Sequence, residues 1–262
     1  MRPRDDGAHA DGFGGPQQGR HPTRAPGDPA PDRADPARAL ADAVRGAAPE
    51  ELPRRLCAAA VELLPVAGAS VSLLSEGLPV LVGASDDHAV GMAEMEATLG
   101  EGPCVCAAET TAPVFAGDLT GGPAVARWPV YAQQATAVGV RAAYSLPLGD
   151  TTVCVGTLNL YGTDPGELAG PDLHTARLLA SALTTALTSL HRDDADAGRL
   201  GGLTHEHSAI QQAIGMVMAQ RGVDAGEALA RLRGRAFACG RTVLEVAHDV
   251  VGHRTRFDRD QP

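Results

Sequence analysis

Residues 208–251 read SAIQQAIGMVMAQRGVDAGEALARLRGRAFACGRTVLEVAHDVV, and they decide the fold of the C-terminal part of the chain. Apolar residues recur there at helical spacing in three runs, which Arg221-Gly222 and Cys239-Gly240 separate. Asp224 and Thr242 each stand three residues before a Glu, a capping-box pattern that starts a helix. Helices this short cannot each bury an apolar stripe alone. The stretch therefore predicts three amphipathic helices that pack on one another or on a partner.

These residues resemble the ANTAR domain, the RNA-binding module of bacterial transcription antitermination regulators. The matching motifs are, in order, Gln212–Met218, Asp224–Leu229, Leu232-Arg233, Ala236-Phe237, Thr242–Ala247 and Asp249–Val251. The resemblance covers nearly all of residues 204–257 without a gap. It implies an RNA target with two small stem-loops near a terminator, which binding would hold in the antiterminator form. A homodimer would present two such modules to the two loops and gain avidity.

The candidate RNA-binding residues are small, polar or basic side chains of the three expected helices. They are Gln212, Gly215, Arg233, Arg235, Arg241, His253 and Arg254. Gly215 lies inside a helix at a cost of about 1 kcal/mol relative to Ala, which close approach of RNA or tight helix packing would each explain. Arg233 and Arg235 face different sides of one helix, and the family pattern includes Arg233. His253 and Arg254 end the third helix, where they can reach phosphates or complement the helix dipole.

Charge is distributed unevenly along the 262 residues, whose formal net charge is −10 and whose 22 basic residues are all Arg. Residues 205–262 hold eight Arg against seven acidic residues, so this segment is close to neutral while the remainder is strongly acidic. RNA binders usually carry a clearly basic surface. If the segment binds RNA, recognition depends on a few well-placed Arg residues.

The Cys content and hydropathy predict a reduced cytoplasmic protein. Five Cys form an odd set without a CxxC metal motif, and no apolar run has the length of a signal peptide or membrane span. We expect no metal site, and the residues identify no cofactor.

The rest of the chain predicts an α+β domain between two polar segments. Residues 1–35 read as a disordered tail, 36–191 as the domain, 192–203 as a linker, 204–257 as the helical module and 258–262 as a tail. Expected strands are 69–75, 78–84, 113–116, 142–148 and 153–161, with turns at 76–77 and 149–150. Expected helices are 37–45, 50–64, 86–99, 128–138 and 171–191, and a loop is expected at 121–123. Strands interspersed with flanking helices favour an antiparallel sheet.

In this order, the residues resemble a GAF domain of the kind joined to ANTAR domains in actinobacteria. The matching motifs are Leu99–Cys104, Ala112–Val114, Asp118-Leu119, Arg127–Pro129, Gly139–Arg141, Leu146–Leu148 and Val155–Tyr161. The resemblance covers roughly residues 37–190 and implies a sensor domain that binds a small ligand or dimerises. It also suggests that such a domain would control the ANTAR domain by dimerising or by releasing it. Gly198, Gly201 and Gly202 interrupt the linker, which disfavours a rigid coiled coil between the two domains.

Candidate ligand-pocket residues are polar or aromatic groups of the expected α+β domain. They are Cys104, Asp118, Trp128, Tyr144 and Asn159. Cys104 follows a Gly-Pro turn, and a thiol at a helix start can have a lowered pKa. No His or Asp stands at a spacing that fixes a Cys/His pair, and a buried, inert Cys is the commoner situation. Gly100–Pro103 lacks the Lys of a phosphate-binding loop. An enzyme that uses Cys104 is therefore disfavoured, and we expect a protein without catalytic activity.

A second interpretation stays open beside the RNA-binding one. Ile214 and His207 stand where many ANTAR domains carry a basic residue, and the module is nearly neutral. Both features favour a regulator whose degenerate ANTAR domain binds a protein partner. Salt dependence separates the two interpretations, because RNA binding weakens steeply as salt rises.

Overall fold

A computed structural model of the chain describes residues 35–75, 78–150, 153–197 and 204–257. The expected turn at 76–77, the linker glycines and the tails at 1–34 and 258–262 lie outside these residues. Contacts group Ala34–Pro262 into one compact unit. Within it, we call residues 36–191 the α/β domain, and α8–α10 the three-helix unit.

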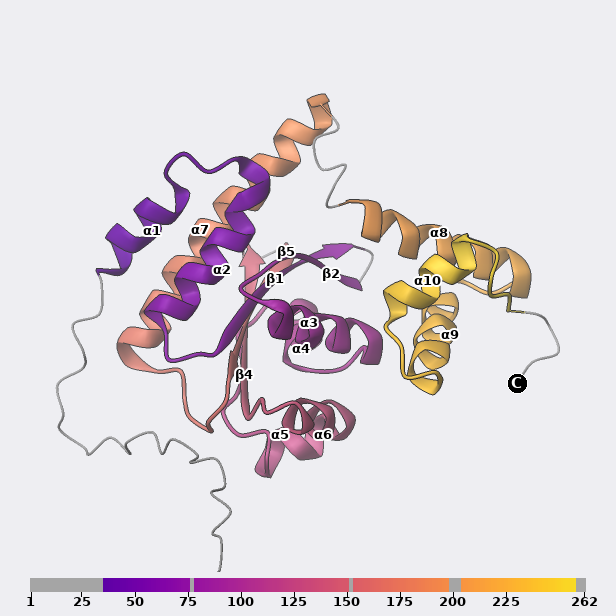
Figure 1. Ribbon diagram of the computed structural model, residues 1–262, viewed down its shortest axis with the longest axis horizontal. Helices are drawn as coiled ribbons and strands as arrows, with labels where there is room; N and C mark the ends of the chain where they lie inside the picture. Colours follow the sequence, from indigo (N-terminus) through magenta and orange to yellow (C-terminus); the bar gives the residue numbers. More distant parts are fainter. Residues whose placement is uncertain (1–34, 76–77, 151–152, 198–203, 258–262) are drawn as a thin grey trace, which may run out of the picture. The chain divides into compact units, whose positions relative to one another are not determined.

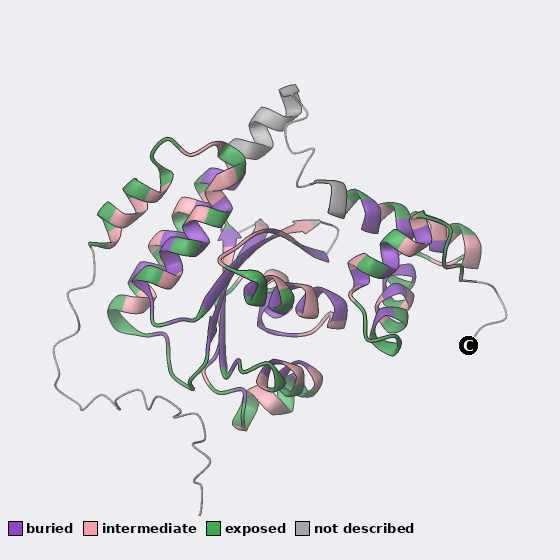
Figure 2. Ribbon diagram, in the orientation of Figure 1, coloured by how far each residue is buried: buried purple, intermediate pink, exposed green. Residues whose placement is uncertain are grey.

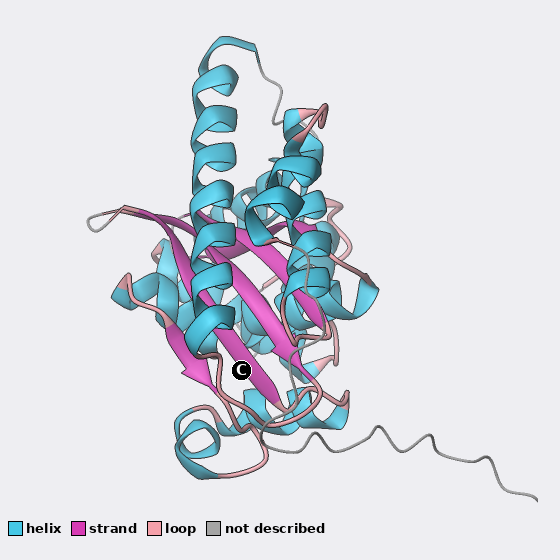
Figure 3. Ribbon diagram, turned by 90° about the vertical axis from the view of Figure 1, so that its left-hand side faces the viewer, coloured by secondary structure: helices cyan, strands magenta, loops and turns pink. Residues whose placement is uncertain are grey.

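The α/β domain is built on one five-stranded antiparallel sheet (Figure 3). Its strands are β1 (Gly68–Ser75), β2 (Leu78–Ala84), β3 (Val114–Ala116), β4 (Ala142–Gly149) and β5 (Cys154–Gly162). Their order in the sheet is β2-β1-β5-β4-β3. The α+β class with an antiparallel sheet is confirmed.

Helices cover both faces of this sheet (Figure 1). One face carries α1 (Pro36–Val44), the short 3-10 helix η1 (Pro49–Glu51), α2 (Leu52–Leu63) and α7 (Gly170–Ala197). The other carries α3 (Asp87–Leu99), α4 (Pro103–Thr110), α5 (Gly122–Arg127) and α6 (Pro129–Ala137). The helices turn their buried sides to the sheet, whose strands are largely buried (Figure 2).

The two faces of the sheet differ in chemistry because side chains alternate along a strand. The face under α2 and α7 is mainly aliphatic and includes Val71, Leu146, Leu148, Leu158 and Leu160. The intervening residues of the same strands are buried and polar, namely Ser70, Ser72, Ser145, Thr157 and Asn159. The side of the sheet that α3 and α4 cover therefore has a polar centre.

The three-helix unit consists of α8 (Thr204–Arg221), α9 (Ala225–Ala238) and α10 (Val243–Val251). Thr242 and Glu245 form a complete capping box at the start of α10. At α9, the Asp224 side chain accepts from Glu227 N–H at 2.8 Å, but the Glu227 carboxylate pairs with Arg231 instead of closing the box. The apolar residues of all three helices form one buried cluster, as the sequence predicts.

The sequence did not predict helices α4 and α5, and the end of α7 differs from the sequence expectation. Helix α5 begins at Gly122, where a loop was expected, and Pro123 next to it suits a first helical turn because it needs no N–H partner there. Helix α7 continues past His191 to Ala197, into the segment expected to be a linker. Among the described residues, no helix combines the length and hydropathy that a membrane span needs.

Candidate functional site

Three of the expected RNA-binding residues are exposed on the three-helix unit and have no side-chain partners among the described residues. Gln212 and Gly215 are exposed on α8, and Arg235 is exposed on α9. A Cβ atom at Gly215 would meet nothing within 4 Å. Tight helix packing therefore does not explain this glycine within the described part of the chain. The open position leaves room for a ligand or partner to approach the backbone.

Two other expected RNA-binding residues share one carboxylate. Arg241 Nη1 lies 2.5 Å from Asp249 Oδ2, and Arg254 Nε donates to Asp249 Oδ1 at 2.7 Å. These hydrogen bonds, from Arg241 first and then Arg254, lower the pKa of Asp249 below its ordinary value. Both guanidinium groups are thus held beside Asp249 on α10, and part of their charge is neutralised.

His253 lies just beyond α10 and is exposed. Its φ is +56°, in the left-handed region, and its N–H donates to the Val250 carbonyl at 3.0 Å. A residue in this conformation ends a helix, so the backbone turns away there. The side chain is accessible to a partner.

Arg233 is held against the α/β domain, unlike its neighbour Arg235. Its Nε donates to the Ala97 carbonyl near the end of α3 at 2.9 Å. Gly100 follows α3 with φ +67°, and a Cβ there would lie 2.7 Å from Arg233 Nη1. Burial lowers the pKa of the guanidinium, while the negative charge of Glu109 acts in the opposite direction. The residue that the family pattern favours for RNA is therefore occupied by an intramolecular contact.

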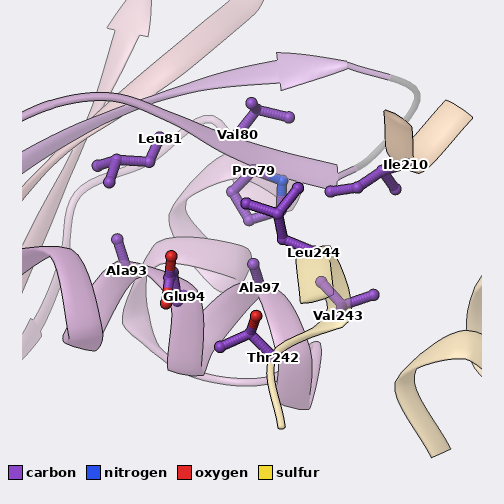
Figure 4. A pocket seen from close by; sticks show the side chains of 10 residues that line it. All are labelled: Pro79, Val80, Leu81, Ala93, Glu94, Ala97, Ile210, Thr242, Val243 and Leu244. Carbon is purple, nitrogen blue, oxygen red and sulfur yellow. The ribbon is translucent and has the colours of Figure 1, made fainter. Parts of the chain in front are cut away.

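A second polar contact and an apolar patch accompany Arg233. The Val243 N–H, the first amide of α10, donates to Thr98 Oγ1 at 3.0 Å. Leu78, Val80 and Ala97 of the α/β domain belong to the same apolar cluster as the core of the three-helix unit. A hollow of about 30 Å³ lies at this contact. Ile210, Leu244, Pro79 and residues of α3 line it (Figure 4).

The interior of the α/β domain holds a buried acid that sequence analysis missed. Glu96 of α3 is 1% exposed, and its Oε1 accepts from Cys104 N–H at 2.9 Å at the start of α4. Its Oε2 is buried and has no hydrogen-bond partner among the described residues. Burial raises the pKa of Glu96 to about 8, although the Cys104 hydrogen bond acts the other way. A signal existed in the sequence, because Glu96 stands four residues after Met92 on the apolar face of an expected helix.

Further polar groups surround Glu96 below the sheet. Cys104 Sγ lies 3.1 Å from Thr157 Oγ1, and Asn159 Oδ1 accepts from Ser145 Oγ at 2.9 Å. Burial, followed by the Glu96 charge, raises the pKa of the Cys104 thiol, which disfavours the thiolate that a nucleophile requires. The Tyr131 hydroxyl is buried without a partner among the described residues. Its pKa is raised by burial and by the Glu96 charge.

The expected pocket residues do not converge on one place. Cys104 and Asn159 lie in the buried polar centre, and Trp128 is buried beside it with the Arg127 guanidinium 4.8 Å from its ring centroid. Tyr144 lies on the opposite face of the sheet, because it pairs with Leu160 while Ser145 pairs with Asn159.

A separate groove of about 670 Å³ lies at the edge of the sheet near β3, and Tyr144 and Asp118 line it. Tyr144 donates from its hydroxyl to the Gly166 carbonyl at 2.9 Å. Asp118 accepts from Thr120 Oγ1 and N–H, and these hydrogen bonds lower its pKa. Both side chains thus hold the local backbone. In the part of the chain that the structure describes, no cluster of His, Cys, Asp or Glu has the makings of a metal site.

Two family models match the chain. The family model of the GAF domain matches residues 46–188, and that of the ANTAR domain matches residues 204–251. No curated protein matches the chain in sequence. Among solved structures, the GAF domain of a phosphoenolpyruvate-protein phosphotransferase from Coxiella burnetii is similar at 16% identity and a TM-score of 0.49, over 63% of this chain and 99% of that chain. A free methionine-R-sulfoxide reductase from Neisseria meningitidis is similar at 14% identity and a TM-score of 0.44, over 63% of this chain and 96% of that chain.

Proposed function

Because the chain belongs to the GAF domain family and also carries an ANTAR domain, we propose that it binds paired RNA hairpins through the ANTAR domain and controls transcription termination. The α/β domain is its GAF domain, and the three-helix unit is its ANTAR domain. Together they make a signal-responsive regulator. In the proposal, the GAF domain senses a small ligand or mediates formation of a homodimer in the cytoplasm.

One observation carries the RNA part of the proposal. The residues that match the ANTAR domain fold as three helices, of which α9 and α10 begin with side-chain N-caps, and Gln212, Gly215 and Arg235 are exposed on them. An amide, an uncovered stretch of helix backbone and a guanidinium are groups that contact unstacked bases and phosphates in RNA loops. A homodimer would present this surface twice, so that two loops of one transcript are held with high effective concentration.

The buried polar centre of the GAF domain supports the sensing part. Glu96 Oε2 and the Tyr131 hydroxyl have no partners among the described residues, and buried polar groups ordinarily have one. A small ligand that forms a hydrogen bond with the Glu96 carboxyl would satisfy this requirement. Cys104 then acts as a lining residue and not as a nucleophile, in keeping with a regulator without catalytic activity.

A protein-binding regulator is the second candidate function. The observation that favours it is the sharing of Asp249 by Arg241 and Arg254, which leaves the ANTAR domain with few unpaired positive charges. A protein partner would tolerate such a surface better than a polyanion does.

Crosslinking of the chain to RNA in its native cell, followed by sequencing, tests the proposal. We expect enrichment of leader transcripts that contain two adjacent stem-loops upstream of a terminator. The Arg235→Ala variant lacks one of the groups proposed to contact RNA and should lose most of this enrichment. Recovery of no RNA above the background of an untagged strain would favour the protein-binding function instead.

A further inference from the structure

The contact between the two domains covers Arg233, a residue that the ANTAR resemblance assigns to RNA. Arg233 reaches the Ala97 carbonyl, and Val243 N–H reaches the Thr98 hydroxyl. Both acceptors belong to the last turn of α3. A guanidinium held there cannot lie on a phosphate at the same time. The docked arrangement and an RNA-bound arrangement that uses Arg233 therefore exclude each other.

Arg233 is incompletely satisfied in the docked arrangement. Its Nη2 is buried and has no hydrogen-bond partner among the described residues, and no carboxylate there pairs with it within salt-bridge distance. Burying a guanidinium without an anion is unfavourable. An RNA phosphate would supply both the anion and a bidentate acceptor. The structure thus holds Arg233 in a contact that an anion can replace.

The apolar part of the contact joins Leu78, Val80 and Ala97 of the GAF domain to the ANTAR core and leaves a hollow beside them. On the GAF side, α3 contributes Ala93 and Ala97, whose side chains bury little area, and the hollow beside them is lined also by Val80 and Leu244 (Figure 4). Because hydrophobic stabilisation scales with buried apolar area, such a contact is weak compared with a domain core. The free energy of a binding event is therefore enough to separate the ANTAR domain from α3.

The turn that holds Arg233 also borders the interior of the GAF domain. Glu96 faces inward and accepts from Cys104 N–H, while the next two residues face the ANTAR domain. Gly102 has φ +132°, and a Cβ there would lie 2.5 Å from Glu96 Oε1. Glu96 is thus fitted closely between α3 and α4. Glu96 and the two acceptors that Arg233 and Val243 use are thus consecutive residues of one turn of α3.

We propose that RNA and the GAF domain compete for the Arg233 face of the ANTAR domain, with the last turn of α3 as the latch. The latch consists of the Ala97 carbonyl, the Thr98 hydroxyl and Gly100. A ligand that binds beside Glu96 displaces this turn and frees Arg233 for RNA. The inference rests on the proposed function, because it concerns the regulation of the same RNA-binding surface.

The amide of Val243 reports the state of the latch in the full chain. As the first residue of α10 it has no partner within its helix, and among the described residues its hydrogen-bond partner is Thr98, which protects it from hydrogen exchange. The Ala97→Asp variant places a charge in the apolar contact and leaves every ANTAR residue intact. The matched control is Ala58→Asp, at an exposed position of α2 on the other side of the sheet.

The test combines this exchange rate with RNA affinity, using a pool of RNAs that each contain two stem-loops with randomised loops. We expect Val243 to exchange faster in Ala97→Asp than in the wild type or the control, and RNA to bind about ten-fold more tightly, since the competent fraction rises. Adding RNA to the wild type should also accelerate exchange at Val243.

A second pair of variants tests the latch if Ala97→Asp does not fold. Thr98→Val removes the acceptor with little change of shape, whereas Thr98→Ser keeps the hydroxyl. We expect RNA to bind about three- to ten-fold more tightly to the Val variant, and the Ser variant to match the wild type. Equal RNA affinity of the wild type and a variant with exposed Val243 would overturn the latch and leave the proposed function standing. Absence of RNA binding in every protein, with Val243 exposed in the variants, would overturn the proposed function and the latch with it.

Discussion

Glu96 is a buried acid whose surroundings make the stability of the GAF domain depend on pH. Its pKa is raised to about 8 because burial penalises the carboxylate, and one oxygen lacks a partner among the described residues. An acid whose pKa is higher in the folded than in the unfolded state binds more protons when folded. Its contribution to stability is complete below the unfolded pKa and is lost as pH rises through about 8.

Glu96→Gln should therefore remove a pH dependence of stability. The amide keeps an acceptor for Cys104 N–H but does not ionise. We expect the variant to gain about 2–4 kcal/mol in unfolding free energy relative to the wild type between pH 5 and pH 9. Urea unfolding at several pH values measures this difference, with Glu62→Gln on the exposed side of α2 as the control. Parallel pH profiles of wild type and variant would contradict the raised pKa.

The two buried tyrosines near Glu96 make a matched pair for mutation. Tyr161 shares a hydrogen bond of 3.0 Å with Ser70 Oγ, whereas the Tyr131 hydroxyl has no partner among the described residues. We expect Tyr161→Phe to lose about 1–2 kcal/mol of unfolding free energy and Tyr131→Phe to lose none or to gain slightly. Thermal unfolding of both variants and of the wild type measures these changes in unfolding free energy. An equal loss in both would mean that Tyr131 has a hydrogen-bond partner in solution.

At the scale of elements, α8 contains an exposed glycine, Gly215, which neither the helical conformation nor helix packing requires. Gly215 and Gly234 both lie inside helices, and a Cβ at either would meet nothing within 4 Å. Replacing each with Ala should stabilise the chain by about 0.5–1 kcal/mol, because Gly has a high conformational entropy to lose. Only Gly215→Ala should also weaken RNA binding, since its methyl group would hold RNA away from α8. Equal RNA affinities of the two variants would remove Gly215 from the binding surface.

The five strands, most of the helices and the domain order could be predicted from the sequence because their signals are local, but the short helices α4 and α5 were missed. Alternating residues define β4 and β5, and the Thr242 capping box starts α10 as expected. The assembly of the pocket could not be predicted in the same way. From the sequence, Tyr144 and Asn159 were both expected to line the ligand pocket, but the register of β4 against β5 puts them on opposite faces of the sheet. That register depends on contacts between strands, which no single strand encodes.

At the scale of the whole molecule, the docking of α9 on α3 lay beyond sequence reasoning. The spacing of Arg233 and Arg235 indicates that they face different sides, but Arg233 meets a carbonyl 136 residues away. Backbone acceptors carry no sequence signature. Outside the ANTAR domain the chain carries a strongly negative net charge, which repels a polyanion such as RNA. RNA binding therefore also depends on how the RNA approaches the ANTAR domain relative to the rest of the chain.

Equilibrium binding of paired-hairpin RNA to the full chain, measured over a series of salt concentrations, tests the central claim most directly. The account predicts affinity that falls steeply with salt, and a uniformly weaker affinity with a shallower salt dependence for Arg235→Ala. Binding that does not respond to salt, or wild-type affinity in Arg235→Ala together with no preference for paired hairpins, would contradict the assignment of this chain as an RNA-binding regulator.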